Sequence, residues 1–261
     1  MSTGQTIYEI VVANAKAAKQ PITPSCGLVA FFDVLGFKSL LENNKVGQAI
    51  SIIREVLVGV PKELELTLKP LGIVNPAFVP KHLVFSDSIL IYAPVETSEP
   101  LVTCFFVSFC REILARLFDN GLPLRGAIAV GEYYVEDYCF AGKPIVEAHE
   151  LGDLLQLSGC ALAANARKHI LGDKESAEIF FEYPAPLKGG EKEDLFMLNF
   201  RPSFSREALA DTRSFVEHQF SAHKKPKGDG VDEKIHNTVA FLEECRRRNP
   251  SCRRAAEDET D

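Results

Sequence analysis

The chain has 261 residues, of which 46% are hydrophobic and 25% charged, and its formal net charge is −7 at pH 7. That length suits one large domain or a domain with an appendage. The acidic balance argues against a general surface for nucleic acid or anionic membrane, so we expect neither partner. No apolar run reaches the roughly 18–20 residues of a membrane span, and the N-terminus lacks the apolar core of a signal peptide. We therefore expect a cytoplasmic protein.

The first half of the chain alternates helix and strand patterns. A weak helical pattern covers residues 7–19. The apolar run 28–32 predicts a strand, and apolar residues at helical spacing predict a helix over 39–58. Residues 61–80 fit no single pattern. The β-branched and aromatic run 83–92 predicts a second strand.

The second half begins with a strongly apolar segment, 101–118, which predicts a helix. The segment 124–135 is interpreted as two strands separated by Gly131, and another helix is expected to begin after Gly142. The later elements are expected to be a helix, two strands and two C-terminal helices, at 161–169, 179–183, 195–200, 203–220 and 232–247.

This order of elements predicts an α+β protein with a ferredoxin-like, split βαβ arrangement, in which helices flank a central, mostly antiparallel sheet. We expect three parts. An N-terminal lead covers residues 1–26, and a main domain covers 27–202. A C-terminal helical extension covers 203–261 and ends in a charged tail that we expect to be disordered.

Two aspartates at apolar strands are the strongest candidates for function. Asp33 closes the run 28–32, and Asp87 lies within the run 82–92. Burying a carboxylate is costly unless it is paired or binds a metal, so the two together suggest one shared cation site. Asp33 is alternatively a turn or N-cap residue, and Asp87 alternatively a buried, hydrogen-bonded aspartate.

Four motifs give the chain a resemblance to a known family. Residues 31–40, Phe-Phe-Asp-Val-Leu-Gly-Phe-Lys-Ser-Leu, resemble the F-x-D-[IV]-x-G-F-[ST]-x-L signature of the class III nucleotidyl cyclases. Residues 85–88 stand where that family has Gly-Asp at a β-hairpin, residues 124–132 resemble its R-[IV]-G-[IV]-x-x-G strand, and residues 187–189 resemble its late L-K-G turn. The resemblance covers about residues 27–200 and implies the class III cyclase fold for the domain 27–202.

The resemblance implies two metal-binding carboxylates. Asp33 and Asp87 would be the catalytic residues that hold two Mg²⁺ or Mn²⁺ ions, which prefer oxygen ligands, and the Val34 carbonyl is a further candidate ligand. These cyclases attack the α-phosphate with the ribose 3′-hydroxyl and expel pyrophosphate. One ion helps to deprotonate the hydroxyl, and the other neutralises the triphosphate.

The resemblance also implies contacts to the triphosphate. Backbone N–H groups around Gly36 and Phe37, at the start of a helix, would bind the β- and γ-phosphates. Lys188 matches a family lysine that contacts the triphosphate, and Lys38 replaces the usual Thr or Ser and adds a second positive charge. A surface position also accounts for Lys38, and a solvated turn for Lys188. Arg125 is either functional or a structural or interface arginine.

The chain departs from the family at two pairs of positions. Family members carry Asn and Arg four residues apart on the helix after Gly142, where this chain has Val146 and Glu150. Adenylate cyclases read the base with Lys and Asp or Thr, and guanylate cyclases with Glu and Cys, where this chain has Leu83 and Cys139. Cys139 fits the guanine pattern, but Leu83 cannot make the hydrogen bond of the Glu. A missing polar partner can cost several orders of magnitude in discrimination, so these two base-pocket candidates argue against a purine reader of the usual type.

In both departures the chain is similar to a divergent branch of the family, the bacterial pyrimidine cyclases of Pycsar anti-phage defence. That likeness implies that UTP or CTP is converted to the 3′,5′-cyclic nucleotide, which then acts on a separate cyclic-nucleotide-responsive effector. Since class III sites form between two protomers, a homodimer with shared active sites is expected, with Lys188 acting across the interface. Two alternatives are a purine cyclase with a non-standard base pocket and a catalytically degenerate domain that binds a nucleotide or another protein.

Overall fold

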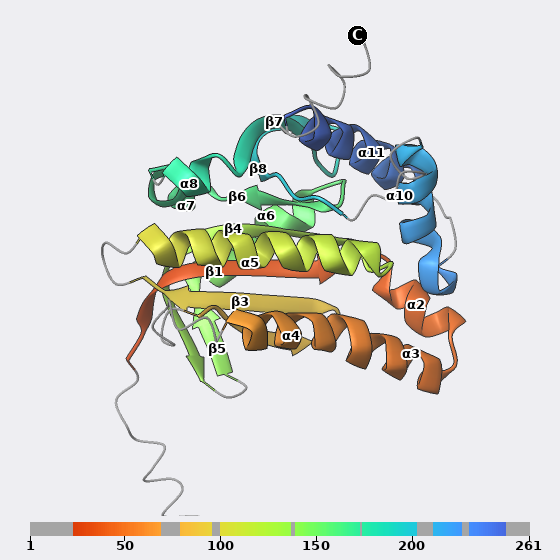
Figure 1. The fold of residues 1–261 in the computed structure, drawn as a ribbon, viewed down its shortest axis with the longest axis horizontal. Helices are drawn as coiled ribbons and strands as arrows, with labels where there is room; N and C mark the ends of the chain where they lie inside the picture. Colours follow the sequence, from red (N-terminus) through yellow and green to blue (C-terminus); the bar gives the residue numbers. More distant parts are fainter. Residues whose placement is uncertain are drawn as a thin grey trace, which may run out of the picture.

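The computed structural model describes residues 23–68, 79–95, 100–136, 139–172, 174–202, 211–225 and 230–248. The helix expected over 7–19 and the tail expected to be disordered lie outside them. The centre is a sheet in the order β2-β3-β1-β4-β6-β8-β7, with β5 paired to β4 (Figure 1). Its strands are β1 (Ser25–Val34), β2 (Lys81–Phe85), β3 (Ser88–Pro94), β4 (Leu124–Glu136), β5 (Cys139–Gly142), β6 (Gly159–Leu162), β7 (Phe180–Pro186) and β8 (Lys192–Leu198).

The predicted ferredoxin-like α+β arrangement is confirmed by the pairing of the strands. β1 and β2 are both antiparallel to β3, so they run parallel on either side of it. β3 and β4 are both antiparallel to β1, so they too are parallel with one strand between them. Helices make each of these crossovers, which gives two split βαβ units.

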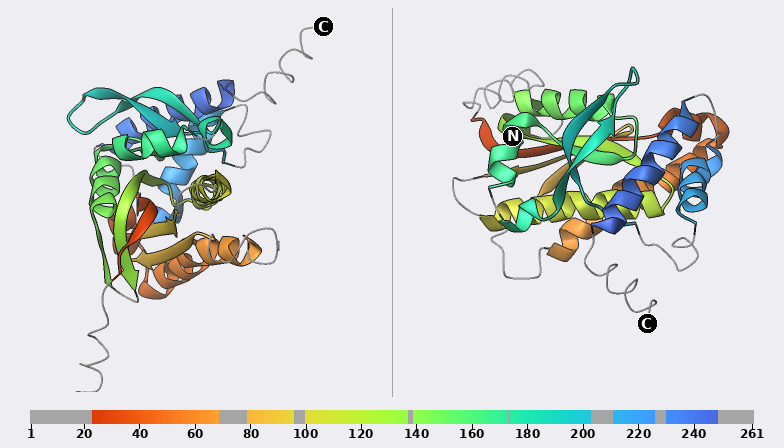
Figure 2. Two further views of the ribbon diagram at one scale, coloured as in Figure 1. Left: turned by 90° about the vertical axis from the view of Figure 1, so that its left-hand side faces the viewer. Right: turned by 90° about the horizontal axis from the view of Figure 1, so that it is seen from above.

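Helices cover both faces of the sheet (Figure 2). The crossover after β1 consists of α2 (Phe37–Asn43), α3 (Val46–Ile52), the π-helical η1 (Ile53–Val58) and α4 (Gly59–Leu68), and α5 (Pro100–Asp119) follows β3. The opposite face carries α6 (Lys143–Leu154). Side chains of β1 alternate between the two layers, because successive residues of a strand point to opposite faces: Phe32 belongs to the larger core with α5, and Phe31 to a smaller core with α6.

Three predicted boundaries are wrong for physical reasons. The run 83–92 is two strands, β2 and β3, rather than one, because Ser86 takes a left-handed φ and forms with Asp87 the two-residue turn between them. The segment 124–135 is one continuous strand, β4, rather than two. Gly131 does not break it; a Cβ there would lie 3.3 Å from the Pro144 ring at the start of α6, so the glycine permits close packing of helix on strand. The segment 161–169 is not all helix. Its first residues complete the fully buried β6, which pairs with β4 in parallel, and α7 (Ala164–Ile170) follows.

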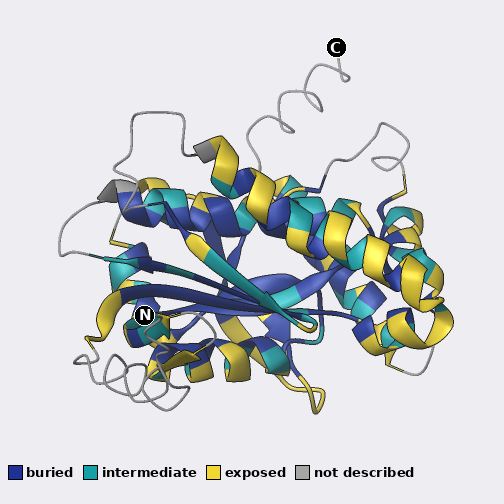
Figure 3. Ribbon diagram, turned by 90° about the horizontal axis from the view of Figure 1, so that it is seen from below, coloured by how far each residue is buried: buried dark blue, intermediate teal, exposed yellow. Residues whose placement is uncertain are grey.

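The remaining helices were predicted more closely. The helix expected over 39–58 is interrupted near Asn44 and continues to Leu68, past Pro61. Beyond α7, a short helix, α8 (Lys174–Ala177), precedes β7. In Figure 3 the strands are mostly buried, while the outer sides of the helices are exposed. Among the described residues, no helix is both long and apolar enough to cross a bilayer.

The C-terminal helices pack on the core. They are α10 (Thr212–Ser221), the 3₁₀ turn η4 (Ala222–Lys224) and α11 (Val231–Arg247). The Phe241 ring of α11 stacks on Phe181 of β7, with 5.7 Å between ring centroids, and lies edge-on to Tyr183. The Phe220 ring of α10 meets Phe118 of α5. Aromatic burial therefore joins this extension to the sheet.

Candidate functional site

Asp33 and Asp87 lie together at one end of the sheet. Asp33 is the penultimate residue of β1 and pairs with Ser88, the first residue of β3. Asp87 immediately precedes Ser88 in the two-residue turn that joins β2 to β3, where Ser86 has a φ of 54°. The Val34 N–H donates to the Asp87 carbonyl over 2.9 Å. Two aspartates that are far apart in the sequence thus lie on neighbouring backbone segments at one end of the sheet.

The Asp33 carboxylate is half-buried and partly engaged. Its Oδ1 accepts a 2.7 Å hydrogen bond from the Ser88 hydroxyl. In the other direction Asp33 pairs with Arg125 of β4, so these two side chains emerge on the same face of the sheet. The alternative interpretation of Asp33 is a turn or N-cap residue. In the structure Asp33 lies in β1, and Gly36 is the N-cap of α2.

The donor set at this edge fits a magnesium-type ion held together with a substrate. Among the described residues no cluster of three or more His, Cys, Asp or Glu side chains is placed to hold a metal. Mg²⁺ bound in nucleotide sites commonly takes only one or two protein carboxylates and completes its shell with phosphate oxygens and water. Asp33 and Asp87 supply that number.

The turn after β1 has a conformation that needs glycine. Gly36 has a φ of 78°, in the left-handed region, and α2 begins at the next residue. The Phe37 side chain is buried in the larger core, whereas the Lys38 side chain is 87% exposed and lies 3.7 Å from Glu42. Lys38 therefore occupies the surface position that was its alternative explanation.

Lys225 of the C-terminal extension packs beneath the same turn. It is only 4% exposed; its aliphatic chain lies against Gly36, and its ammonium donates to the Gly121 carbonyl over 2.7 Å. Burial lowers its pKa to about 8. The preceding His223 and Lys224 both have left-handed φ values, and His223 is held by Asn44 and by the Asn120 carbonyl. We call residues 223–225 the C-terminal clasp.

Arg125 and Lys188 converge on a residue that sequence reasoning missed, Asp153 at the end of α6. Arg125 donates to the Asp153 carboxylate and, over 2.8 Å, to its carbonyl, and the Lys188 ammonium donates to the same carboxylate over 2.7 Å. The Lys188 hydrogen bond is the main cause that lowers the pKa of Asp153, and the charge of Arg125 adds to it. The two cations lie 28 and 35 positions from Asp153, so no local sequence signal marked it.

The two base-pocket candidates lie on segments that approach each other. Leu83 is half-buried in β2, and Cys139 is exposed at the start of β5. Phe85 and Phe140, close to each in sequence, stack with 5.0 Å between centroids, which draws β2 and β5 together. Leu83 and Phe85 pack on the same smaller core, whereas Cys139, next to Phe140 in β5, points to the opposite face of its strand.

The residues that replace the missing Asn–Arg pair face outward. Val146 is 53% exposed and Glu150 is also exposed, one turn apart on α6. Because four residues separate them, they share one face of the helix. An apolar and an acidic side chain on that face cannot donate hydrogen bonds to a phosphate.

No family model matches the sequence, and no curated protein matches it. Solved structures similar in fold include the guanylyl cyclase Cya2 (TM-score 0.49, 10% identity, covering 72% of this chain and 98% of that one). Two others are the guanylate cyclase domain of RhGC from Catenaria anguillulae in complex with GTP (0.48, 14%, 68% and 97%) and a bacterial light-regulated adenylyl cyclase (0.48, 12%, 76% and 99%). At these TM-scores and identities the likeness by itself decides no chemistry for this chain.

Proposed function

We propose that this protein is a metal-dependent nucleotide cyclase. The observation that carries the proposal is the meeting of Asp33 and Asp87 at the ends of β1 and the β2–β3 turn, where the cyclase motifs require two carboxylates. The ferredoxin-like order of strands adds support, because it brings the four motifs into one domain.

In the proposed reaction the ribose 3′-oxygen forms a bond to the α-phosphorus, and the bond from that phosphorus to the pyrophosphate oxygen breaks. Asp33 and Asp87, with the Val34 carbonyl, would hold two Mg²⁺ or Mn²⁺ ions. When bound, these ions make the hydroxyl more acidic and neutralise phosphate charge. The backbone of Gly36 and Phe37 would orient the phosphates.

The basic residues of the site have defined starting positions. Lys188 must leave the Asp153 carboxylate before its ammonium can pair with a triphosphate. The Arg125 nitrogen that binds Asp153 must also leave that carboxylate before it can contact a phosphate. In the proposed homodimer Lys188 would make this contact in the partner's site. Asp153 would then act as the resting counter-ion of both cations. Lys38, being exposed, is free to approach a phosphate.

For the substrate we propose a pyrimidine nucleotide, UTP or CTP. The support is Leu83, which cannot make the hydrogen bond that purine readers make at this position and which lies beside Phe85 of the Phe85–Phe140 stack. A flat aromatic surface suits a base of either ring size, so the assignment rests on the missing polar atoms. The product would be a second messenger in anti-phage defence and would act on a cyclic-nucleotide-responsive effector.

A second candidate function is a non-catalytic domain that binds a nucleotide or a protein. Val146 and Glu150 favour it, because they remove the side chains that stabilise the transition state in the family. A purine cyclase with another base pocket is the enzymatic alternative.

The test is incubation of the purified protein with each of the four nucleoside triphosphates and Mn²⁺. A cyclic pyrimidine nucleotide supports the proposal, a cyclic purine nucleotide supports the enzymatic alternative, and no product supports the non-catalytic one. Asp33→Asn and Asp87→Asn should each lower turnover by about 100-fold or more, since several kcal/mol of charge stabilisation depend on the ions. Asp232→Asn, an exposed carboxylate on α11, is the matched control. Full activity in either Asp33→Asn or Asp87→Asn would show the metal assignment to be wrong.

A further inference from the structure

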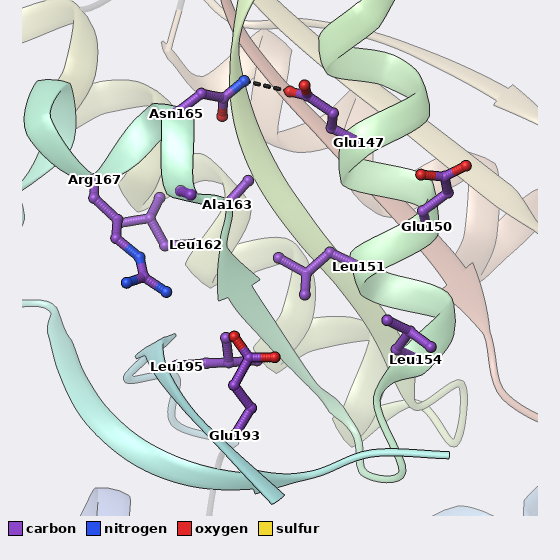
Figure 4. Close-up of a pocket in the computed structure, with 11 residues that line it drawn as sticks. Glu147, Glu150, Leu151, Leu154, Leu162, Ala163, Asn165, Arg167, Glu193 and Leu195 are labelled. Carbon is purple, nitrogen blue, oxygen red and sulfur yellow. Dashed lines mark hydrogen bonds between the residues drawn. The ribbon is translucent and has the colours of Figure 1, made fainter. Parts of the chain in front are cut away.

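A hollow of about 470 Å³ lies between α6, β6, α7 and β8 (Figure 4). None of Asp33, Asp87, Gly36 or Lys188 lines it. Its apolar surface consists of leucines from three elements, Leu151 and Leu154 of α6, Leu162 of β6 and Leu195 of β8. The volume falls within the range of small-molecule sites, and an apolar lining with a few polar groups is typical of them.

Arg167 of α7 brings a guanidinium to the lining of this hollow. Its guanidinium carbon lies 5.6 Å from the centre of the Phe196 ring, which fixes the side chain by a cation–π contact. Its Nε is buried and sealed from solvent, so a ligand in the hollow would meet the guanidinium through its terminal nitrogens. A guanidinium binds a carboxylate through two parallel N–H bonds, so the site suits a carboxylate ligand.

Carboxylates supply the opposite charge. Glu193 of β8 points toward the space that Arg167 enters, and Glu150 stands on the α6 side (Figure 4). Within the described part of the chain neither forms an ion pair. Glu147, by contrast, is already bonded to Asn165. The lining therefore presents one free donor cation, free carboxylates and an apolar floor.

We propose that this hollow binds a free α-amino acid with an apolar side chain, of about the size of leucine. The ligand's carboxylate accepts from Arg167, its ammonium pairs with Glu193, and its side chain packs on the leucines. An aliphatic acid without an amine meets the carboxylates of Glu193 and Glu150, and an amine without a carboxylate leaves the Arg167 guanidinium without an anion. Both halves of the zwitterion are required together.

Calorimetric titration of the full chain with L-leucine tests the proposal, with 4-methylpentanoate and 3-methylbutylamine as analogues that lack the amine or the carboxylate. We expect L-leucine to bind and each analogue to bind at least 10-fold more weakly. Arg167→Met and Glu193→Gln should each weaken the binding of L-leucine by at least 10-fold. Lys168→Met, the exposed neighbour on α7, should not change it.

Absence of L-leucine binding at 10 mM would overturn the proposal, as would binding of either analogue as tight as that of L-leucine. Unchanged affinity in both Arg167→Met and Glu193→Gln would do the same. Should Arg167→Met fail to fold, as judged by its thermal unfolding, Arg167→Lys replaces it. That variant keeps the charge but lacks the planar guanidinium that binds a carboxylate through two N–H bonds, so weaker binding is again expected. The titration requires no turnover, so its outcome is independent of the cyclase assay.

Discussion

The two faces of the sheet are covered to different degrees. The face toward α5 belongs to one large core that also takes in the C-terminal helices, and α5 contributes fully buried side chains such as Phe106. The face toward α6 has a smaller core, and its margin is left partly exposed, with Phe140 37% exposed. Asp33, Arg125 and Asp153 lie on this second face. The closed face therefore supplies most of the stability, and the open face supplies the side chains available for binding.

Truncating one aromatic ring on each face should separate these roles most clearly. Phe106→Ala should lower the free energy of unfolding by about 3–5 kcal/mol, because it empties a fully buried site. Phe140→Ala should lower it by about 1 kcal/mol or less, since much of this ring is already in contact with water. Urea unfolding measures both. Equal losses would show that the two faces are packed alike.

Lys225 should make the free energy of unfolding depend on pH in the alkaline range. Its pKa in the fold is about 8 because of burial, whereas the unfolded chain retains the proton up to about pH 10.4. Between these values the unfolded state binds more protons, so the free energy of unfolding rises with pH, by at most about 3 kcal/mol. This rise should be absent in Lys225→Met and present in the control Lys224→Met. Urea unfolding at pH 7.5 and 9.5 measures it, and an undiminished rise in Lys225→Met would contradict the assignment.

Asp153, on the less covered face of the sheet, should make the free energy of unfolding depend on pH in the acidic range, and more weakly than Lys225 does in the alkaline range. Lys188 and Arg125 lower the pKa of its carboxyl in the fold, so the stabilisation is present above the unfolded pKa of about 3.9 and is lost as the pH falls through the lower, folded value. Because the Asp153 side chain is 43% exposed, solvent screening limits the effect to about 1 kcal/mol or less. Asp153→Asn should remove this part of the loss of thermal stability between pH 6 and 3. A control is Asp194→Asn, on the exposed part of β8; an identical pH profile in the two variants would contradict the role of Asp153.

Periodicity and local motifs in the sequence predicted a large part of the fold. Alternating and helical apolar patterns located β1, α5, α6 and α11, and the two aspartates at apolar strands predicted a shared site. The same patterns merged β2 and β3 into one strand, so the turn that carries Asp87 was not predicted from them. The same patterns did not reveal β6, because Cys160 and its apolar neighbours suit a buried strand and a buried helix equally. They also did not reveal the convergence on Asp153 or the position of Lys225, since these depend on pairings between distant segments.

The C-terminal clasp has a consequence for the order of events during synthesis. The bond from Asn44 to the His223 carbonyl spans 179 positions, and that from His223 to the Asn120 carbonyl spans 103. A chain emerging from the ribosome can form β1 and α2 early, yet the lysine that underlies Gly36 is made only after every strand of the sheet. The turn that we assign to the triphosphate thus receives its final support after the rest of the sheet has been synthesised.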